Sequence, residues 1–191
     1  MKSTDMKIGV LALQGAFSEH ITILISLGVQ PVEVRQAKEL RGLDGLIIPG
    51  GESTTMLKLL RLEDLFEPLR RFGERRSIFG TCAGAILLAN RVTSPDQESL
   101  GLMDIDVERN GYGRQLNSHV AMLEDAEGGP LEAVFIRAPI IRRVGPAARV
   151  LAGYRGDPVL VEQGRHLAAT FHPELTADAR VHAWFLKMVS A

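Results

Sequence analysis

Residues 7–27, KIGVLALQGAFSEHITILISL, contain the pattern that decides the fold. Lys7–Leu13 is an apolar run of strand length, and it ends in the turn-forming pair Gln14-Gly15. In the segment that follows, apolar side chains recur at the spacing of one helix face, at Ile21, Leu24, Ile25 and Leu27. A buried strand, a turn and a helix in this order predict a parallel sheet, because parallel strands need crossover helices to connect them.

The alternation of strands and helices continues along the chain. Strand-like runs occur at 31–34, 46–48 and 77–79, and helical patterns occur at 54–69, 85–90 and 177–189. The second half has short strands between Gly and Pro turns, which read as a mixed extension of the sheet, at 105–108, 133–137, 150–154, 158–162 and 167–171. We therefore expect an α/β protein with a mixed, mostly parallel central sheet and helices on both faces.

Size and charge narrow the class of protein. The 191 residues fit a single domain, 1–191. The net charge of -1, from 22 basic and 23 acidic side chains, gives no electrostatic footprint for nucleic acid or an anionic membrane. No apolar run approaches the roughly 18 residues of a membrane-spanning helix. The first apolar run is short and interrupted by Gln14, so we reject a secretory signal and predict a cytoplasmic protein.

The single cysteine, Cys82, stands in the sequence GTCAG at 80–84, after a strand and before a helix. Small neighbours let the backbone turn sharply there, and such a turn lifts a nucleophile above the sheet. The following helix points its first N–H groups at the sulfur, which favours the thiolate. The pattern predicts a nucleophile, with a buried filler cysteine as the alternative. A lone cysteine excludes an internal disulfide and a cysteine-based zinc cluster.

One of the five histidines has a setting that suits a catalytic base. His172 ends a predicted strand and precedes Pro173, and Glu174 lies two positions on, where an extended chain points to the same side. A carboxylate there can hold one ring nitrogen while the other faces Cys82. The alternative is a pair of surface residues at a strand end. The other histidines are interpreted as structural or exposed: His20, His119, His166 and His182.

The segment PGGES at 49–53 follows the third predicted strand. A double glycine there lets backbone N–H groups point into a site. We predict an oxyanion hole formed by the N–H groups of Gly51 and of Ala83, the residue after the nucleophile. The alternative is a helix cap, with Ser53 capping a helix that begins at Thr54.

Three motifs in this order resemble those of the triad-type glutamine amidotransferases: PGGEST at 49–54, GTCAG at 80–84 and FHPELT at 171–176. Further segments are similar to the glutaminase subunits of pyridoxal 5'-phosphate synthases, and the resemblance covers nearly the whole chain. These segments are IGVLALQGAFSEH near the start, VERNGYGRQ at 107–115 and VFIRAP at 134–139.

The resemblance implies a flavodoxin-like three-layer fold and the hydrolysis of L-glutamine to L-glutamate and ammonia. In its terms Cys82 is the nucleophile, His172 the acid-base and Glu174 the carboxylate that orients it. It also implies a partner, a (β/α)8-barrel synthase subunit in a large hetero-oligomer. The barrel receives the ammonia through the protein interior and builds pyridoxal 5'-phosphate from a pentose phosphate and a triose phosphate. No metal and no organic cofactor is implied.

The resemblance also assigns residues around the triad. Gln14 and Gly15 match a loop whose rearrangement on docking of the partner completes the oxyanion hole. The chain departs from the usual family pattern at Tyr112, where phenylalanine is frequent, and at His119, where an aromatic residue is common. The positions that match glutamine-binding residues are Gly51, Glu52, Ser53, Arg109, Ile136 and Arg137.

Three alternatives remain open from the sequence. The glutaminase could serve another acceptor, as in the imidazole glycerol phosphate synthase complex. The chain could be a non-catalytic binding subunit of the same fold. A cysteine hydrolase or chaperone of the related flavodoxin-like type should lack the distal His-Pro-Glu. For Arg109 and Arg137 a solvated or structural charge is the alternative to substrate binding.

Overall fold

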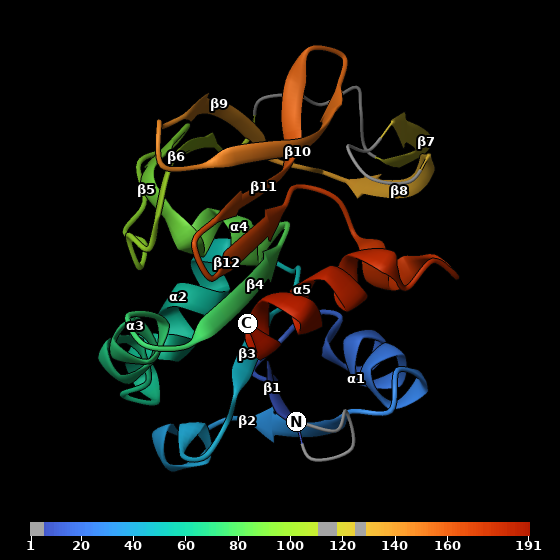
Figure 1. Ribbon diagram of the computed structural model, residues 1–191. Helices are drawn as coiled ribbons and strands as arrows, with labels where there is room; N and C mark the ends of the chain where they lie inside the picture. Colours follow the sequence, from blue (N-terminus) through green and yellow to red (C-terminus); the bar gives the residue numbers. More distant parts are fainter. Residues whose placement is uncertain (1–5, 111–117, 125–128) are drawn as a thin grey trace.

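The computed structural model describes residues 6–110, 118–124 and 129–191. Its central feature is a seven-stranded sheet in the order β10-β11-β12-β4-β3-β1-β2 (Figure 1). The five strands from β12 to β2 are parallel to one another, and β10 and β11 extend the sheet antiparallel at one edge. The strands are β1 Lys7–Leu11, β2 Gln30–Val34, β3 Gly45–Ile48, β4 Ser77–Thr81, β10 Arg149–Tyr154, β11 Asp157–Gln163 and β12 His166–Ala169.

Helices cover both faces of the sheet (Figure 1). One face packs against α1 Phe17–Ser26 and α5 Arg180–Ser190, whose buried side chains share one apolar cluster with Ile47 of β3. The other face packs against α2 Ser53–Leu62, α3 Phe66–Gly73 and α4 Ala83–Leu88, in a second cluster with Leu46 and Ile48. Successive β3 side chains thus point to opposite cores, as expected for a strand buried on both faces. The predicted α/β architecture is confirmed.

Two smaller sheets lie beside the main one. The first has the order β5-β6-β9, formed by Ala89–Thr93, Met103–Glu108 and Ile140–Val144. The second is the antiparallel pair β7 Ser118–Glu124 and β8 Pro130–Ile136. The expected strands at 105–108 and 133–137 therefore exist but pair here, whereas those at 150–154, 158–162 and 167–171 extend the main sheet. The prediction of a mixed extension of the sheet is therefore wrong for the strands at 105–108 and 133–137, because tertiary packing decides which strands pair.

The helix expected at 54–69 is two helices. The first ends at Leu62, Asp64 has a φ of 48°, and α3 begins at Phe66. Pro68 is the third residue of α3, in the first turn, where its missing N–H has no intrahelical acceptor to lose. Short 3-10 turns complete the structure, η2 at Ala37–Leu40 and η3 at Pro173–Leu175. None of the helices in the described ranges is long and apolar enough to cross a membrane.

Candidate active site

Cys82 lies in the turn between β4 and α4, at the carboxyl end of the central strand. Its backbone has φ 48° and ψ -101°, a conformation that L-residues rarely adopt. A Cβ on Gly80 would lie 2.5 Å from the carbonyl of Gly84, and one on Gly84 would lie 2.1 Å from the carbonyl oxygen of Ile48. Both flanking residues must therefore be glycine for the strand and the helix to approach this closely. The backbone N–H of Cys82 donates to Ala169 of β12 at 2.8 Å, which ties the turn to the neighbouring strand.

His172 and Glu174 reach the same turn from the other side. The backbone N–H of His172 donates to Val134 of β8 at 2.8 Å, and its Nδ1 lies 2.7 Å from Oε1 of Glu174. A Cβ on Gly50 would lie 2.3 Å from Cε1 of His172 and 3.3 Å from Cβ of Cys82. The imidazole and Cys82 therefore flank the same glycine. The structure brings together the three side chains that the sequence singled out.

The imidazole of His172 is buried between two groups that stabilise its charged form. Burial by itself lowers the pKa of a histidine, but hydrogen bonds with Cys82 and Glu174 outweigh it and raise the pKa of His172 to about 10. At neutral pH the ring is an imidazolium, which can hold a negative sulfur and carry a proton to a leaving group.

The raised pKa predicts how stability depends on pH. An unperturbed histidine titrates near 6.5 and His172 in the folded protein near 10, so folding tightens proton binding. The contribution of His172 to the free energy of unfolding is then fully present below about pH 6.5 and is lost as the pH rises through about 10. Denaturant unfolding of wild type and His172→Gln across this range measures it. We expect the difference between the two proteins to shrink with rising pH, and a constant difference would contradict the assignment.

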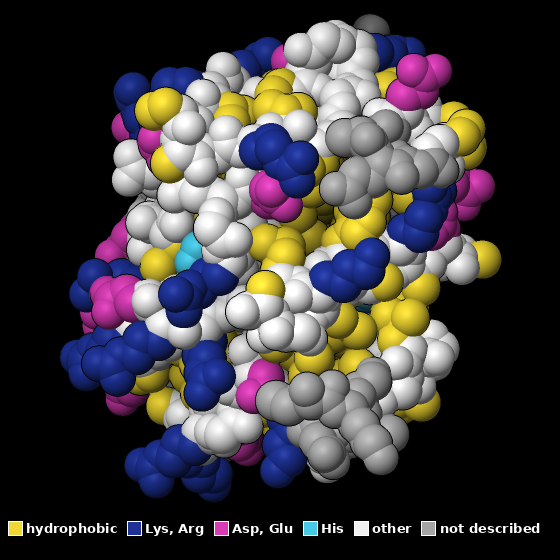
Figure 2. Space-filling model, viewed as in Figure 1, with side chains coloured by type: hydrophobic (Ala, Val, Ile, Leu, Met, Phe, Trp, Pro, Cys, Tyr) yellow, Lys and Arg dark blue, Asp and Glu magenta, His cyan; other side chains and the backbone are white. Residues whose placement is uncertain are grey.

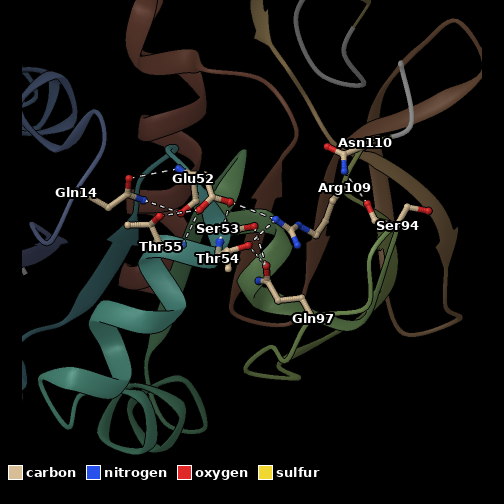
Figure 3. Close-up of polar contacts among 9 residues, drawn as sticks. All are labelled: Gln14, Glu52, Ser53, Thr54, Thr55, Ser94, Gln97, Arg109 and Asn110. Carbon is tan, nitrogen blue, oxygen red and sulfur yellow. Dashed lines mark hydrogen bonds and ion pairs between the residues drawn. The ribbon is translucent and has the colours of Figure 1, made fainter. Parts of the chain in front are cut away.

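The loop after β3 ends in a helix cap formed by Glu52. Its carboxylate accepts hydrogen bonds from the N–H groups of Thr54 at 3.0 Å and Thr55 at 2.6 Å (Figure 3). Burial opposes the charge on Glu52, but these bonds outweigh it and lower its pKa to about 2. The alternative with Ser53 as the cap is therefore wrong, since Ser53 is the first residue of α2 and its hydroxyl donates to Gln97 at 2.9 Å. A carboxylate can take two N–H donors where a hydroxyl usually takes one.

Arg109 joins this loop from the end of β6. Its guanidinium donates to Glu52 at 3.2 Å and to the hydroxyl of Thr54 at 2.7 Å (Figure 3). The next residue, Asn110, donates to the carbonyl of Ser94 at 2.8 Å. Arg109 is thus positioned by protein groups, and it lines the same pocket as Cys82. Tyr112, which departs from the family pattern, lies outside the described residues.

Gln14 and Gly15 contact the same loop from the end of β1. The side chain of Gln14 donates to the carbonyl of Glu52 at 3.2 Å and accepts from its N–H at 3.3 Å (Figure 3). Gly15 has a φ of 85°, and a Cβ there would lie 1.8 Å from the carbonyl oxygen of Gly50. Gly51, at φ 149°, leaves room for the amide of Gln14, because a Cβ would lie 2.5 Å from its nitrogen. The Gln14 loop and the backbone around Gly51 are therefore in direct contact.

A pocket of about 370 Å³ joins these parts. Most of the predicted residues line it, and Glu174 lies behind His172. Arg137 forms part of the wall at a φ of 45°, a strained value for a side chain other than glycine. Two lining residues were not singled out from the sequence, Ile86 on α4 and Asn110 inside VERNGYGRQ. The lining is Gly51, Glu52, Ser53, Cys82, Ile86, Arg109, Asn110, Ile136, Arg137 and His172.

A larger hollow, of about 670 Å³, lies elsewhere, between η2 and α3. Its polar lining consists of arginines, and Lys and Arg side chains gather around this side of the molecule in Figure 2. The residues that line it include no cysteine, serine or threonine and no histidine or carboxylate. The smaller pocket is therefore the candidate active site.

Four histidines were expected to be structural or exposed, and the structure buries two of them, His20 and His182, completely behind the triad. His20 of α1 lies 3.5 Å from Oε2 of Glu174, and His182 of α5 lies 2.8 Å from His20. No local signal points to this contact, although His20 ends the segment QGAFSEH that carries part of the family resemblance. His166 is also buried, and its Nδ1 accepts from the N–H of Ile78 at 3.3 Å. It has a structural role, as expected.

A family model and two relatives of similar sequence agree with the family resemblance of the three motifs. The model of the SNO glutamine amidotransferase family matches residues 10–191. The pyridoxal 5'-phosphate synthase subunit PdxT of Solibacter usitatus (strain Ellin6076) is 61% identical over 187 residues, covering 94% of this chain and 97% of the relative. The PdxT subunit of Koribacter versatilis (strain Ellin345) is 56% identical over 185 residues, with 96% of each chain covered.

Solved structures agree with these relatives. The crystal structure of a glutamine amidotransferase superposes with a TM-score of 0.91 at 48% identity, covering 96% of this chain and 99% of the other. The structure of PurLQS from Thermotoga maritima superposes with a TM-score of 0.69 at 15% identity, covering 97% of this chain and 96% of the other. The second match extends the likeness in fold to a more distant protein.

Proposed function

Since this chain belongs to the SNO glutamine amidotransferase family, we propose that its Cys82, His172 and Glu174 hydrolyse L-glutamine for a pyridoxal 5'-phosphate synthase. The chain is the glutaminase subunit of such a synthase. The observation that carries the proposed site is the buried pair of His172 and Glu174, 2.7 Å apart, next to Cys82 at a strained turn in the wall of a pocket.

Hydrolysis proceeds in two stages. The thiolate of Cys82 attacks the side-chain amide carbon of glutamine, and the carbonyl oxygen becomes an oxyanion. The N–H of Gly51 and the N–H of Ala83 receive that oxygen, since Ala83 is the first residue of α4 and its N–H has no intrahelical acceptor. His172 protonates the departing nitrogen, ammonia leaves, and a glutamyl thioester remains on Cys82.

Water completes the cycle. His172, now neutral, takes a proton from a water molecule as the oxygen attacks the thioester carbon. Glutamate leaves, and the proton returns His172 to the imidazolium that pairs with the thiolate. Glu174 holds Nδ1 of His172 throughout, so that Nε2 is presented to the reacting atoms.

The rest of the pocket supplies the binding of glutamine. Arg109 and Arg137 offer positive charge for the carboxylate of the amino acid, and Arg109 is already positioned by Glu52 and Thr54. Gly51, Ser53 and Ile136 form the walls beside the side-chain amide. Each of these roles is part of the proposal.

The partner of this cytoplasmic subunit is a (β/α)8-barrel synthase subunit in a hetero-oligomer, which takes up the ammonia. The two hydrogen bonds between Gln14 and the backbone of Glu52 support a coupling of docking to the site. A barrel that displaces Gln14 or Gly15 also displaces the Gly51 N–H, and the oxyanion hole is completed in that step.

Reconstitution tests the function. The chain is mixed with a barrel synthase, a pentose phosphate and a triose phosphate, and the formation of pyridoxal 5'-phosphate is followed with glutamine or with an ammonium salt as the nitrogen source. We expect product from both sources, and none from glutamine when the chain is left out. If the chain is present and product forms from the ammonium salt but not from glutamine, the chain does not supply ammonia to this synthase.

A further inference from the structure

A line of buried side chains continues from the triad into the protein. Oε1 of Glu174 faces Nδ1 of His172, and Oε2 faces Nε2 of His20 at 3.5 Å. Nε2 of His20 also lies 3.3 Å from the hydroxyl of Thr81, the residue before Cys82. On its other side, Nδ1 of His20 lies 2.8 Å from Nε2 of His182. The helices α1 and α5 and the turn η3 thus meet at one group of ring nitrogens and one carboxylate.

Both inner histidines are neutral. Burial lowers the pKa of His20 well below its usual value, and the nearby rings of His182 and His172 lower it further. Burial lowers the pKa of His182 to about 4. Both rings also make T-shaped contacts with the ring of Phe79. A neutral imidazole has one N–H and one bare nitrogen, so the hydrogen-bonding partners decide which nitrogen carries the proton.

The partners favour one arrangement. If Nδ1 of His20 carried the proton, its bare Nε2 would face the carboxylate of Glu174, and His182 would be left with a buried N–H on Nδ1. Nδ1 of His182 has no partner, and an orphaned buried N–H is rarer than an orphaned acceptor. The consistent arrangement is therefore an N–H on Nε2 of His182 donating to His20, and an N–H on Nε2 of His20 directed at Thr81 and Glu174.

This arrangement directs an N–H group at the second carboxylate oxygen of Glu174. Its side chain is fully buried, Oε1 is occupied by His172, and Oε2 has no hydrogen bond that meets the usual geometry. A buried carboxylate oxygen without a donor is costly and leaves the group free to rotate away from its partner. The 3.5 Å contact with His20 is longer than a usual hydrogen bond, but it places Nε2 of this neutral imidazole at Oε2.

We propose that His20, oriented by His182, is a positioning residue for glutamine hydrolysis: its Nε2–H faces Oε2 of Glu174 and keeps Oε1 on His172. The proposal rests on the proposed function of the triad. It extends the functional line to five residues, Cys82, His172, Glu174, His20 and His182. The competing view is that both inner histidines only fill the core between α1 and α5.

A pair of substitutions at His20 separates these views. Glutamine can place an amide N–H near the position of Nε2, whereas asparagine reaches only the position of Nδ1. We expect His20→Asn to lower kcat of the full chain, assayed with its synthase, by about 10- to 100-fold with KM within about threefold. His20→Gln should keep kcat within about threefold of wild type. Thermal unfolding of both variants checks that the fold is retained. A role of His20 in filling the core would instead predict equal effects of the two substitutions on kcat.

A measurement on the wild-type protein tests the proposed positions of the histidine protons without any substitution. Nitrogen-15 chemical shifts of the histidine rings report which ring nitrogen carries the proton. We expect the Nε2–H form for His20 and His182 at neutral pH. An Nδ1–H form at His20, unchanged activity of His20→Asn, or equal losses in both variants would each overturn the inference. A wild type that fails to hydrolyse glutamine would instead overturn the proposed function, and the ring assignments would still stand or fall on their own.

Discussion

Replacing Cys82 with alanine should reduce glutamine hydrolysis by at least about a thousandfold, because no other thiol can form the acyl intermediate. The chain contains a single cysteine. Alanine keeps the Cβ and so meets the same backbone conformation at φ 48°. Within the described residues, the sulfur makes one weak hydrogen bond besides its contact with His172, to the carbonyl of Ile136 at 3.9 Å. The fold should therefore persist, and circular dichroism together with thermal unfolding checks this.

Two controls sharpen this expected result. Cys82→Ala should still bind glutamine, measured by calorimetry, because the rest of the pocket lining is unchanged. The reconstituted complex with this variant should still make pyridoxal 5'-phosphate from an ammonium salt. Retention of full turnover with glutamine would eliminate Cys82 as the nucleophile, whereas loss of the ammonium reaction would point to a damaged assembly.

The second large effect is expected at Gly50, which never touches the reacting atoms in the proposed mechanism. A Cβ there would lie 2.3 Å from Cε1 and 2.9 Å from Nδ1 of His172. The ring cannot give way cheaply, since it is buried and its Nδ1 is held by Glu174 at 2.7 Å. Gly50→Ala should push the imidazole off Cys82 and lower kcat by about a hundredfold or more, which steady-state kinetics measures.

Gly153 offers a matched control for the same chemical change. A Cβ at this position would meet one atom, the carbonyl oxygen of Asp157, at an ordinary 3.5 Å. Gly153→Ala on β10 should therefore keep activity and stability close to wild type. Equal activity in the Gly50 and Gly153 variants would mean that His172 is not held where the structure places it.

Local patterns were sufficient for much of the fold. The run Lys7–Leu13, the helical spacing after it and the repeated breaks after strands predicted a mostly parallel sheet with two covered faces. They failed where a short signal competed with packing. The pattern at 54–69 has helical spacing throughout, but the chain leaves the helix at Asp64 and begins another at Phe66. The sheet β5-β6-β9 forms because these three strands pair with one another, and the residues of a strand do not by themselves specify its pairing partner.

The candidate site shows the same division. GTCAG, PGGEST and FHPELT singled out Cys82, Gly51, His172 and Glu174 because each motif has its own backbone requirement or residue spacing. Glu52 and not Ser53 caps α2, because the carboxylate of Glu52 lies within hydrogen-bonding distance of the N–H groups of Thr54 and Thr55. A pattern of residue types does not give such distances.

The sequence by itself determined the chemistry: one thiol between two glycines, one histidine with a carboxylate two positions on, and strands of the length that a parallel sheet needs. Only the tertiary structure decided which buried side chains lie behind Glu174 of the triad. His20 and His182 are 162 residues apart and meet because α1 and α5 pack on the same face of the sheet. Such contacts arise from the packing of whole elements, and no local residue pattern encodes them.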